Sequence, residues 1–190
     1  MVSRRAFLGG AAVLLLGAQA RADEGATWER LRSGGLVLLI RHASTEPGLG
    51  DPAGFRLGDC ATQRNLSEAG REEARRIGAR FKSERVSVAK VYTSPWCRCR
   101  ETAMLAFGRA EDWAPLSSFF DFPHEEVGFT ERVKKRIAGH ARGKSGGNVV
   151  MVTHNVNIAA LSRQSVAPGE IVVMRPEGCC DARMVERLKT

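Results

Sequence analysis

The chain has 190 residues, and its 29 lysines and arginines outnumber 21 acidic residues, which gives a formal net charge of +8. That length suits one domain with a buried core, and the basic balance favours anionic ligands. Aromatic residues make up only 6% of the chain and do not interleave with a basic stripe, which argues against a nucleic-acid-binding surface.

The first 22 residues have the layout of an export signal rather than of a folded segment. An arginine pair at positions 4 and 5 precedes an apolar run over residues 6–18, and small residues follow. At about 1.5 Å of rise per residue, this run is too short to cross a membrane core of about 30 Å; the alternative is a buried helix or a short anchor. The arginine pair and the Phe-Leu pair after it resemble the twin-arginine class of signal. We expect a signal peptide over residues 1–22, cleaved after Ala20 or Ala22.

Cleavage after Ala22 would leave one mature domain over residues 23–190. Its charge would be +5, because the signal carries three arginines and no acid. We expect the product to be periplasmic or otherwise exported, with the export machinery as the partner of the signal. No cysteine lies near the cleavage point, so we expect no stable membrane anchor after cleavage.

Apolar runs and turn residues predict strands that alternate with helices along the mature chain. The predicted strands cover residues 36–40, 88–93, 148–152, 171–174 and 184–188. Helices are predicted after the N-cap residue Ser67, from Pro95 to about Phe107 with Ser94 as its cap, over about 125–141 and over 158–162. The segment 45–65 is expected to be a long loop, and residues 113–123 are expected to be irregular or a short strand. This alternation predicts an α/β fold, a three-layer sandwich around a mainly parallel sheet.

Charged and imidazole side chains stand where three predicted strands end. The first strand runs directly into Arg41 and His42, the third is followed by His154, and Arg98 lies in the helical turn after the second. Ligands of open α/β sheets bind beyond the carboxyl ends of the strands. We therefore expect these four side chains to converge on one crevice.

Two histidines and two arginines are a set that suits phosphoryl transfer. A neutral imidazole can attack phosphorus, and guanidinium groups bind phosphate oxygens through two parallel hydrogen bonds. The sequence shows no carboxylate cluster suited to magnesium and no paired Cys-x-x-Cys spacing suited to zinc. We therefore expect chemistry without a metal or a cofactor.

Motifs of this chain resemble, in the same order, the signature of the histidine phosphatase superfamily, which has the phosphoglycerate mutase-like fold. They are Leu39-Ile40-Arg41-His42-Ala43, Leu66-Ser67-x-x-Gly70 with Ala74, Ser94-Pro95-x-x-Arg98-x-x-Glu101-Thr102-Ala103 and Val152-Thr153-His154. The resemblance spans about residues 36–160. It implies a phosphatase in which His42 is the nucleophile and forms a covalent phosphohistidine. It also implies that Arg41, Arg98 and His154 form the phosphate pocket.

The chain departs from the family pattern at three places. Ala43 replaces the usual glycine, and the pair over residues 155–156 is Asn-Val where two glycines often follow the second histidine. Gly48 stands where many members carry an asparagine, six positions after the nucleophile. The last departure removes one expected polar contact.

The proton donor for the leaving group is the open part of this assignment. Members of the family usually take it from a Glu or Asp after the second arginine helix. We favour Asp121, because its phenylalanine neighbours would favour the protonated form of a carboxyl group. A turn aspartate without catalytic role is the alternative interpretation. The other available carboxyl groups are those of Glu46, Asp51, Asp59, Glu111, Asp112, Glu125 and Glu126.

Five cysteines are present, so at least one thiol is free or pairs between chains. They are Cys60, Cys97, Cys99, Cys179 and Cys180. An exported chain is exposed to oxidising conditions, and a disulfide that joins Cys60 to Cys97 or to Cys99 is our hypothesis.

Three functions are consistent with these observations. The first is a phosphomonoesterase acting on a small-molecule or envelope phosphate ester. The second is a mutase-type phosphotransferase or a phosphohistidine phosphatase. The third is an inactive module that binds phosphate or sugar phosphate, which would have no need for a nucleophile.

Overall fold

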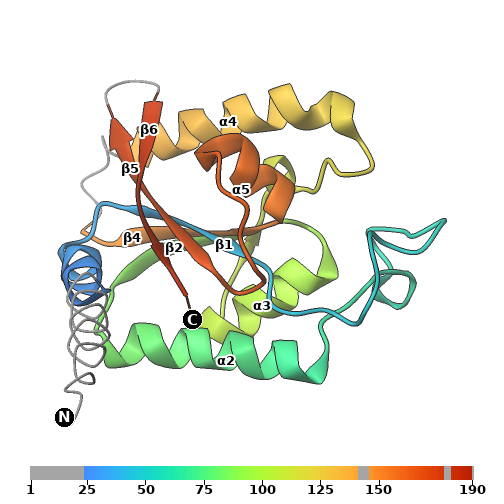
Figure 1. The fold of residues 1–190 in the computed structure, drawn as a ribbon, viewed down its shortest axis with the longest axis horizontal. Helices are drawn as coiled ribbons and strands as arrows, with labels where there is room; N and C mark the ends of the chain where they lie inside the picture. The colour runs from blue at the N-terminus through green and yellow to red at the C-terminus, as the bar shows by residue number, and fades with distance from the viewer. Residues whose placement is uncertain (1–23, 141–145, 178–180, 190) are drawn as a thin grey trace, which may run out of the picture.

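The computed structural model describes residues 24–140, 146–177 and 181–189, so the predicted signal peptide and Cys179 and Cys180 lie outside the described residues. A six-stranded sheet forms the middle layer (Figure 1). Its strands are β1 (Val37–Arg41), β2 (Val88–Thr93), β3 (Glu111–Asp112), β4 (Asn148–Thr153), β5 (Ile171–Glu177) and β6 (Asp181–Leu188). They lie in the order β3-β2-β4-β1-β5-β6.

Pairing is parallel from β3 to β1 and antiparallel only where β5 joins β1 and β6. The α-helices are α2 (Glu68–Ser83), α3 (Cys97–Phe107), α4 (Glu126–His140) and α5 (Asn155–Ser162), and residues 24–33 are also helical. Helices α2 and α3 cover one face of the sheet, and α4 and α5 cover the other (Figure 1). The predicted three-layer α/β sandwich around a mainly parallel sheet is confirmed.

β1 is buried on both faces because its side chains alternate between two apolar clusters. Leu38 and Ile40 pack with the apolar face of α2 and α3. Val37 and Leu39 pack on the other side, with the buried residues of α4. A continuous apolar run in the sequence therefore marks the central strand that carries the first histidine at its end.

Helix α2 begins directly beneath the loop that follows the first histidine. Ser67 caps the helix by accepting a hydrogen bond from the Gly70 N–H at 3.1 Å, and its own N–H donates to the Ser44 carbonyl at 3.1 Å. A Cβ atom at Gly70 would lie only 1.8 Å from the Ser44 carbonyl oxygen. The Leu-Ser-x-x-Gly motif is thus a packing requirement that fixes the backbone next to the site.

Helix α3 begins at Cys97, so the prediction that Ser94 caps it with Pro95 at the first helical position is wrong. Trp96 occupies the N-cap position and makes no side-chain capping hydrogen bond. The Ser94 hydroxyl instead lies 2.9 Å from Nε2 of His154. The Ser94 hydroxyl thus combines this tertiary contact with a local hydrogen bond from the Trp96 N–H, ahead of the first residue of the helix.

Within the described ranges, no helix combines the length and the apolar character needed to cross a membrane.

Candidate active site

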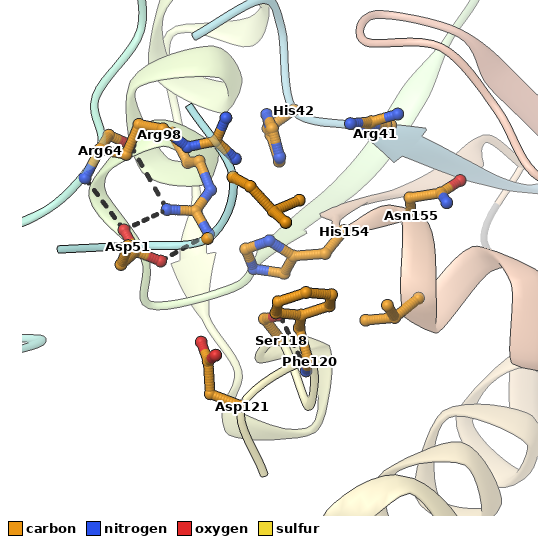
Figure 2. Close-up of a pocket in the computed structure, with 13 residues that line it drawn as sticks. Arg41, His42, Asp51, Arg64, Arg98, Ser118, Phe120, Asp121, His154 and Asn155 are labelled. Carbon is orange, nitrogen blue, oxygen red and sulfur yellow. Dashed lines mark hydrogen bonds and ion pairs between the residues drawn. The ribbon is translucent and has the colours of Figure 1, made fainter. Parts of the chain in front are cut away.

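Three strand ends bring the predicted residues together. Arg41 is paired with Thr153 at the ends of β1 and β4, so His42 and His154 follow side by side, and Arg98 lies in the first turn of α3 after β2. All four line one pocket of about 190 Å³ (Figure 2). The predicted convergence at the carboxyl ends of the strands is therefore what the structure shows.

One backbone hydrogen bond fixes the tautomer of His42. Its Nδ1 atom lies 2.9 Å from the carbonyl oxygen of Ala43. Because a carbonyl cannot donate, Nδ1 carries the hydrogen and Nε2 of the neutral ring keeps its lone pair. A lone pair on Nε2 is what a nucleophile requires.

Burial keeps this ring neutral. His42 is 4% exposed, and removal of the charged form from water lowers its pKa to about 3. The positive charges of three neighbouring arginines contribute to the lowering. At any pH from about 5 upward, His42 is therefore an unprotonated base.

His154 is the second buried imidazole, and its ring centroid lies 5.5 Å from that of His42. Ser94 Oγ accepts a hydrogen bond from the Trp96 N–H and lies 2.9 Å from Nε2 of His154. In the tautomer in which the Ser94 hydroxyl donates to Nε2, the hydrogen of the neutral ring lies on Nδ1, where it can be donated to an anion. Burial lowers the pKa of His154 well below its ordinary value.

Three guanidinium groups line the pocket. Nη1 of Arg41 donates to the Val166 carbonyl at 2.5 Å, and Nη1 of Arg64 donates to the Gly48 carbonyl at 2.6 Å. The Nε atoms of Arg41, Arg64 and Arg98 are buried and have no hydrogen-bond acceptor among the described residues. Three positive charges at one pocket favour a bound anion.

The arginines also lower one another's pKa. Burial lowers the pKa of Arg41 first, and the charges of Arg64 and Arg98 add to the effect. Burial likewise lowers the pKa of Arg64, again with a contribution from Arg98. Guanidinium groups stay protonated in proteins, so a negative charge bound between them would relieve this mutual repulsion.

Asp51 holds Arg98 in a buried two-pronged ion pair. Nη1 and Nη2 of Arg98 lie 2.7 and 3.0 Å from the two carboxylate oxygens, and the side chains are 4% and 2% exposed. Asp51 also accepts hydrogen bonds from the Trp96 indole at 3.1 Å and from the Arg64 backbone N–H at 2.9 Å. Burial works to raise the pKa of Asp51, but these hydrogen bonds outweigh it and lower the pKa. Asp51 is therefore an anchor for Arg98 rather than a proton donor.

A disulfide between Cys60 and Cys97 fastens the long loop to the first residue of α3. Of the two pairings in the hypothesis, the structure has the one with Cys97. Next to it, the Cys97 N–H donates to Gln63 of the loop at 3.0 Å. Cys99 is free and buried, and burial raises the pKa of its thiol to about 12, so it is an unreactive core residue.

Asp121 lines the pocket but is exposed to solvent. Its neighbours Phe120 and Phe122 are 52% and 41% exposed and only Phe119 is buried, so the apolar enclosure expected around Asp121 is not formed. Asp51 and Asp121 are the carboxylates in the lining. The other carboxyl groups that the sequence offered lie outside it: Glu46, Asp59, Glu111, Asp112, Glu125 and Glu126. Within the described ranges, no group of three or more metal-ligating side chains could hold a metal ion.

Sequence reasoning missed Arg64 and assigned no positioning role to Asp51. Both lie in the long loop, where no periodic pattern points to their side chains. One departure from the family pattern, Asn155 after the second histidine, has a structural explanation. Asn155 accepts a hydrogen bond from the Val166 N–H at 2.8 Å, which supports the backbone that binds Arg41.

The sequence model of the histidine phosphatase superfamily (branch 1) matches residues 37–117. No curated protein resembles the chain closely enough in sequence to count as a relative. Several solved structures share its fold.

One is the protein histidine phosphatase SixA complexed with tungstate, with a TM-score of 0.57 and 16% identity over 81% of this chain and 96% of that one. A putative phosphohistidine phosphatase SixA from Agrobacterium tumefaciens has a TM-score of 0.54 and 22% identity over 82% and 98% of the two chains. A phosphoserine phosphatase from Entamoeba histolytica, solved as a mutant with phosphoserine, has a TM-score of 0.56 and 12% identity over 80% and 95%. At these identities, the likeness shows a common fold.

We predict that the stability of the protein falls between pH 6.5 and pH 4.5. The unfolded state binds a proton on His42 below about pH 6.5, whereas the folded state does so only near pH 3. The free energy of unfolding should therefore drop by about 2–3 kcal/mol over this range from His42 alone. Urea denaturation at several pH values measures it, and His42→Asn should show a smaller drop. An equal drop in both proteins would contradict this account.

Asp51→Ala should destabilise the protein by about 3–5 kcal/mol, because it leaves the Arg98 charge buried without a partner. Glu72→Ala is the matched control, since Glu72 forms an exposed ion pair with Arg75 at 2.7 Å and should contribute at most about 1 kcal/mol. Urea denaturation of both variants at pH 7 makes the comparison. Similar losses of stability in the two variants would show that the ion pair between Asp51 and Arg98 does not anchor the loop.

Proposed function

We propose that this chain is a histidine phosphatase that hydrolyses a phosphomonoester through a covalent phosphohistidine on His42, because the superfamily model matches residues 37–117 and a solved histidine phosphatase shares the fold. One observation carries the proposal. The lone pair of a neutral, buried His42 lies in a pocket that three guanidinium groups make strongly positive.

In the first step, Nε2 of His42 attacks phosphorus and the bond from phosphorus to the ester oxygen breaks. Arg41, Arg64 and Arg98 would bind the phosphoryl oxygens through their guanidinium groups, and His154 would donate from Nδ1. These donors are already fixed by other contacts, so they need little rearrangement as charge develops on the oxygens. The leaving oxygen takes a proton from a carboxylic acid, which we assign to Asp121.

In the second step, water attacks the phosphohistidine from the side that the alcohol has left. The bond from phosphorus to Nε2 breaks, inorganic phosphate forms, and Nε2 regains its lone pair. Asp121, now a carboxylate, accepts the proton of the attacking water. No step in this sequence calls for a metal or a cofactor.

A phosphohistidine phosphatase is the second candidate, and one observation favours it. Asp121 is exposed, and the buried carboxylate Asp51 is committed to Arg98. A phosphorus–nitrogen bond breaks with less help from an acid than the phosphorus–oxygen bond of an alkyl phosphate does. SixA structures share the fold of this chain, although at 16% and 22% identity.

We also propose that the protein acts outside the cytoplasm, on a small-molecule or envelope phosphate ester, after export through its twin-arginine-type signal. The disulfide between Cys60 and Cys97 supports this proposal, because such bonds persist in oxidising compartments.

The first test is turnover of an aryl phosphate in EDTA. We expect the wild type to release phosphate and His42→Ala to lose about a thousandfold or more in kcat. ³²P label from the substrate should remain on the wild-type chain after an alkaline quench and be lost in acid, as expected of phosphohistidine. A wild type as inactive as His42→Ala across a panel of phosphates would favour the binding module instead.

The second test concerns the proton donor. Asp121→Asn should lower kcat for an alkyl phosphate by about a hundredfold, because the alkoxide leaving group needs a proton. The loss for an aryl phosphate, a better leaving group, should be several times smaller. Glu125→Gln, a substitution of an acid outside the pocket, is the control. Equal rates for Asp121→Asn and wild type on alkyl phosphate, with faster turnover of phosphoramidate, would support the phosphohistidine phosphatase.

A further inference from the structure

Apolar side chains stand at the mouth of the pocket, where solvent reaches them. Leu49 is 87% exposed and Phe120 is 52% exposed, and both line the pocket together with Val156. Phe120, His154 and Asp121 line the same pocket (Figure 2). Large exposed apolar side chains beside a catalytic pocket are a signal of ligand binding.

The loop holds Leu49 in its exposed position. On one side of it, the Gly48 carbonyl accepts a hydrogen bond from Arg64 at 2.6 Å. On the other side, Asp51 is locked by its buried ion pair with Arg98. The exposure of Leu49 is therefore built into the anchored loop.

Phe120 is held in the same way, on the opposite segment. Its N–H donates to Ser118 Oγ at 3.2 Å, and its neighbour Phe119 is buried in the core. A Cβ atom placed on Gly50 would lie 3.8 Å from Cε1 of Phe120, so the two segments meet at the mouth. Leu49 and Phe120 thus form the two sides of one apolar rim.

Two polar side chains near this rim are partly committed to the protein itself. Ser118 Oγ accepts a hydrogen bond from the Phe120 N–H, and Asn155 exchanges hydrogen bonds with Ser165 and accepts one from the Val166 N–H. A sugar or glycerol group brings several hydroxyls that need partners, and these two side chains leave few groups for them. An alkyl group needs only apolar surface.

We propose that the rim of Leu49, Phe120 and Val156 binds the leaving group of the substrate, and that this group is an apolar alcohol. The proposal rests on the proposed phosphatase function. Nucleophile and leaving group lie in line across phosphorus. With Nε2 of His42 at the inner end of the pocket, the ester oxygen points outward, and its carbon chain meets the rim.

The test is a series of n-alkyl phosphates from ethyl to hexyl, whose leaving alcohols differ in apolar length but little in acidity. Burial of each methylene in a half-open rim should raise kcat/KM about twofold, so hexyl phosphate should exceed ethyl phosphate by about tenfold or more. Leu49→Ser and Phe120→Ser should reduce that ratio to about threefold or less. Both side chains are exposed, so neither change removes core packing.

Met104→Ser is the matched control, because Met104 is 51% exposed but does not line this pocket. This variant should keep the wild-type ratio and the wild-type activity. Chain-length preference that survives unchanged in Leu49→Ser and Phe120→Ser would overturn the proposal, as would faster turnover of glycerol phosphate than of hexyl phosphate.

A binding experiment separates this proposal from the proposed function. Calorimetry with ethyl- and hexylphosphonate, which cannot be hydrolysed, should show about tenfold tighter binding of the hexyl compound to the wild type and a smaller difference in Leu49→Ser. Tighter binding without any turnover would refute the phosphatase and keep the apolar rim. Turnover without a chain-length effect would refute the apolar rim and keep the phosphatase.

Discussion

Arg98 and Asp51 meet in an ion pair that is almost completely shielded from water. Either charge alone would be costly in that position, so the pair fixes both partners and, with them, the loop and the first turn of α3. The Asp51 carboxylate also accepts hydrogen bonds from the Trp96 indole and the Arg64 backbone N–H. Nearby, the disulfide between Cys60 and Cys97 links the loop to α3. Both the phosphate end and the mouth of the pocket depend on this attachment.

In the pocket, the positive charge and the nucleophilic lone pair lie on different side chains. Buried guanidinium groups keep their charge, because an arginine does not lose its proton under physiological conditions. A buried imidazole gives up its charge, and the lowered pKa values of His42 and His154 follow from the same loss of water. One environment thereby produces a positive site for an anion and a neutral base inside it.

The sequence was enough to predict five of the six strands described, all except β3, and the four side chains that follow the strand ends. Strand periodicity is a local pattern, and parallel strands place their carboxyl ends at one edge of the sheet. The proximity of Arg41, His42 and His154 could therefore be predicted from the sequence. Asp51 and Arg64 could not, because a tertiary ion pair rather than a local pattern sets their positions. The predicted start of α3 was wrong for the same reason, because the hydroxyl of its expected cap, Ser94, contacts the distant His154.

The two ends of the pocket come from different kinds of structure. Strand ends and helix α3 place the groups that would hold the phosphoryl group, and their packing leaves little freedom. Loop residues around Leu49 and the segment from Ser118 to Asp121 place everything that a leaving group would touch, including the proposed proton donor. Loops tolerate substitution better than buried strands do. In the proposed phosphatase, a change in the loop residues could therefore redirect activity to another alcohol while the chemistry at His42 stays the same.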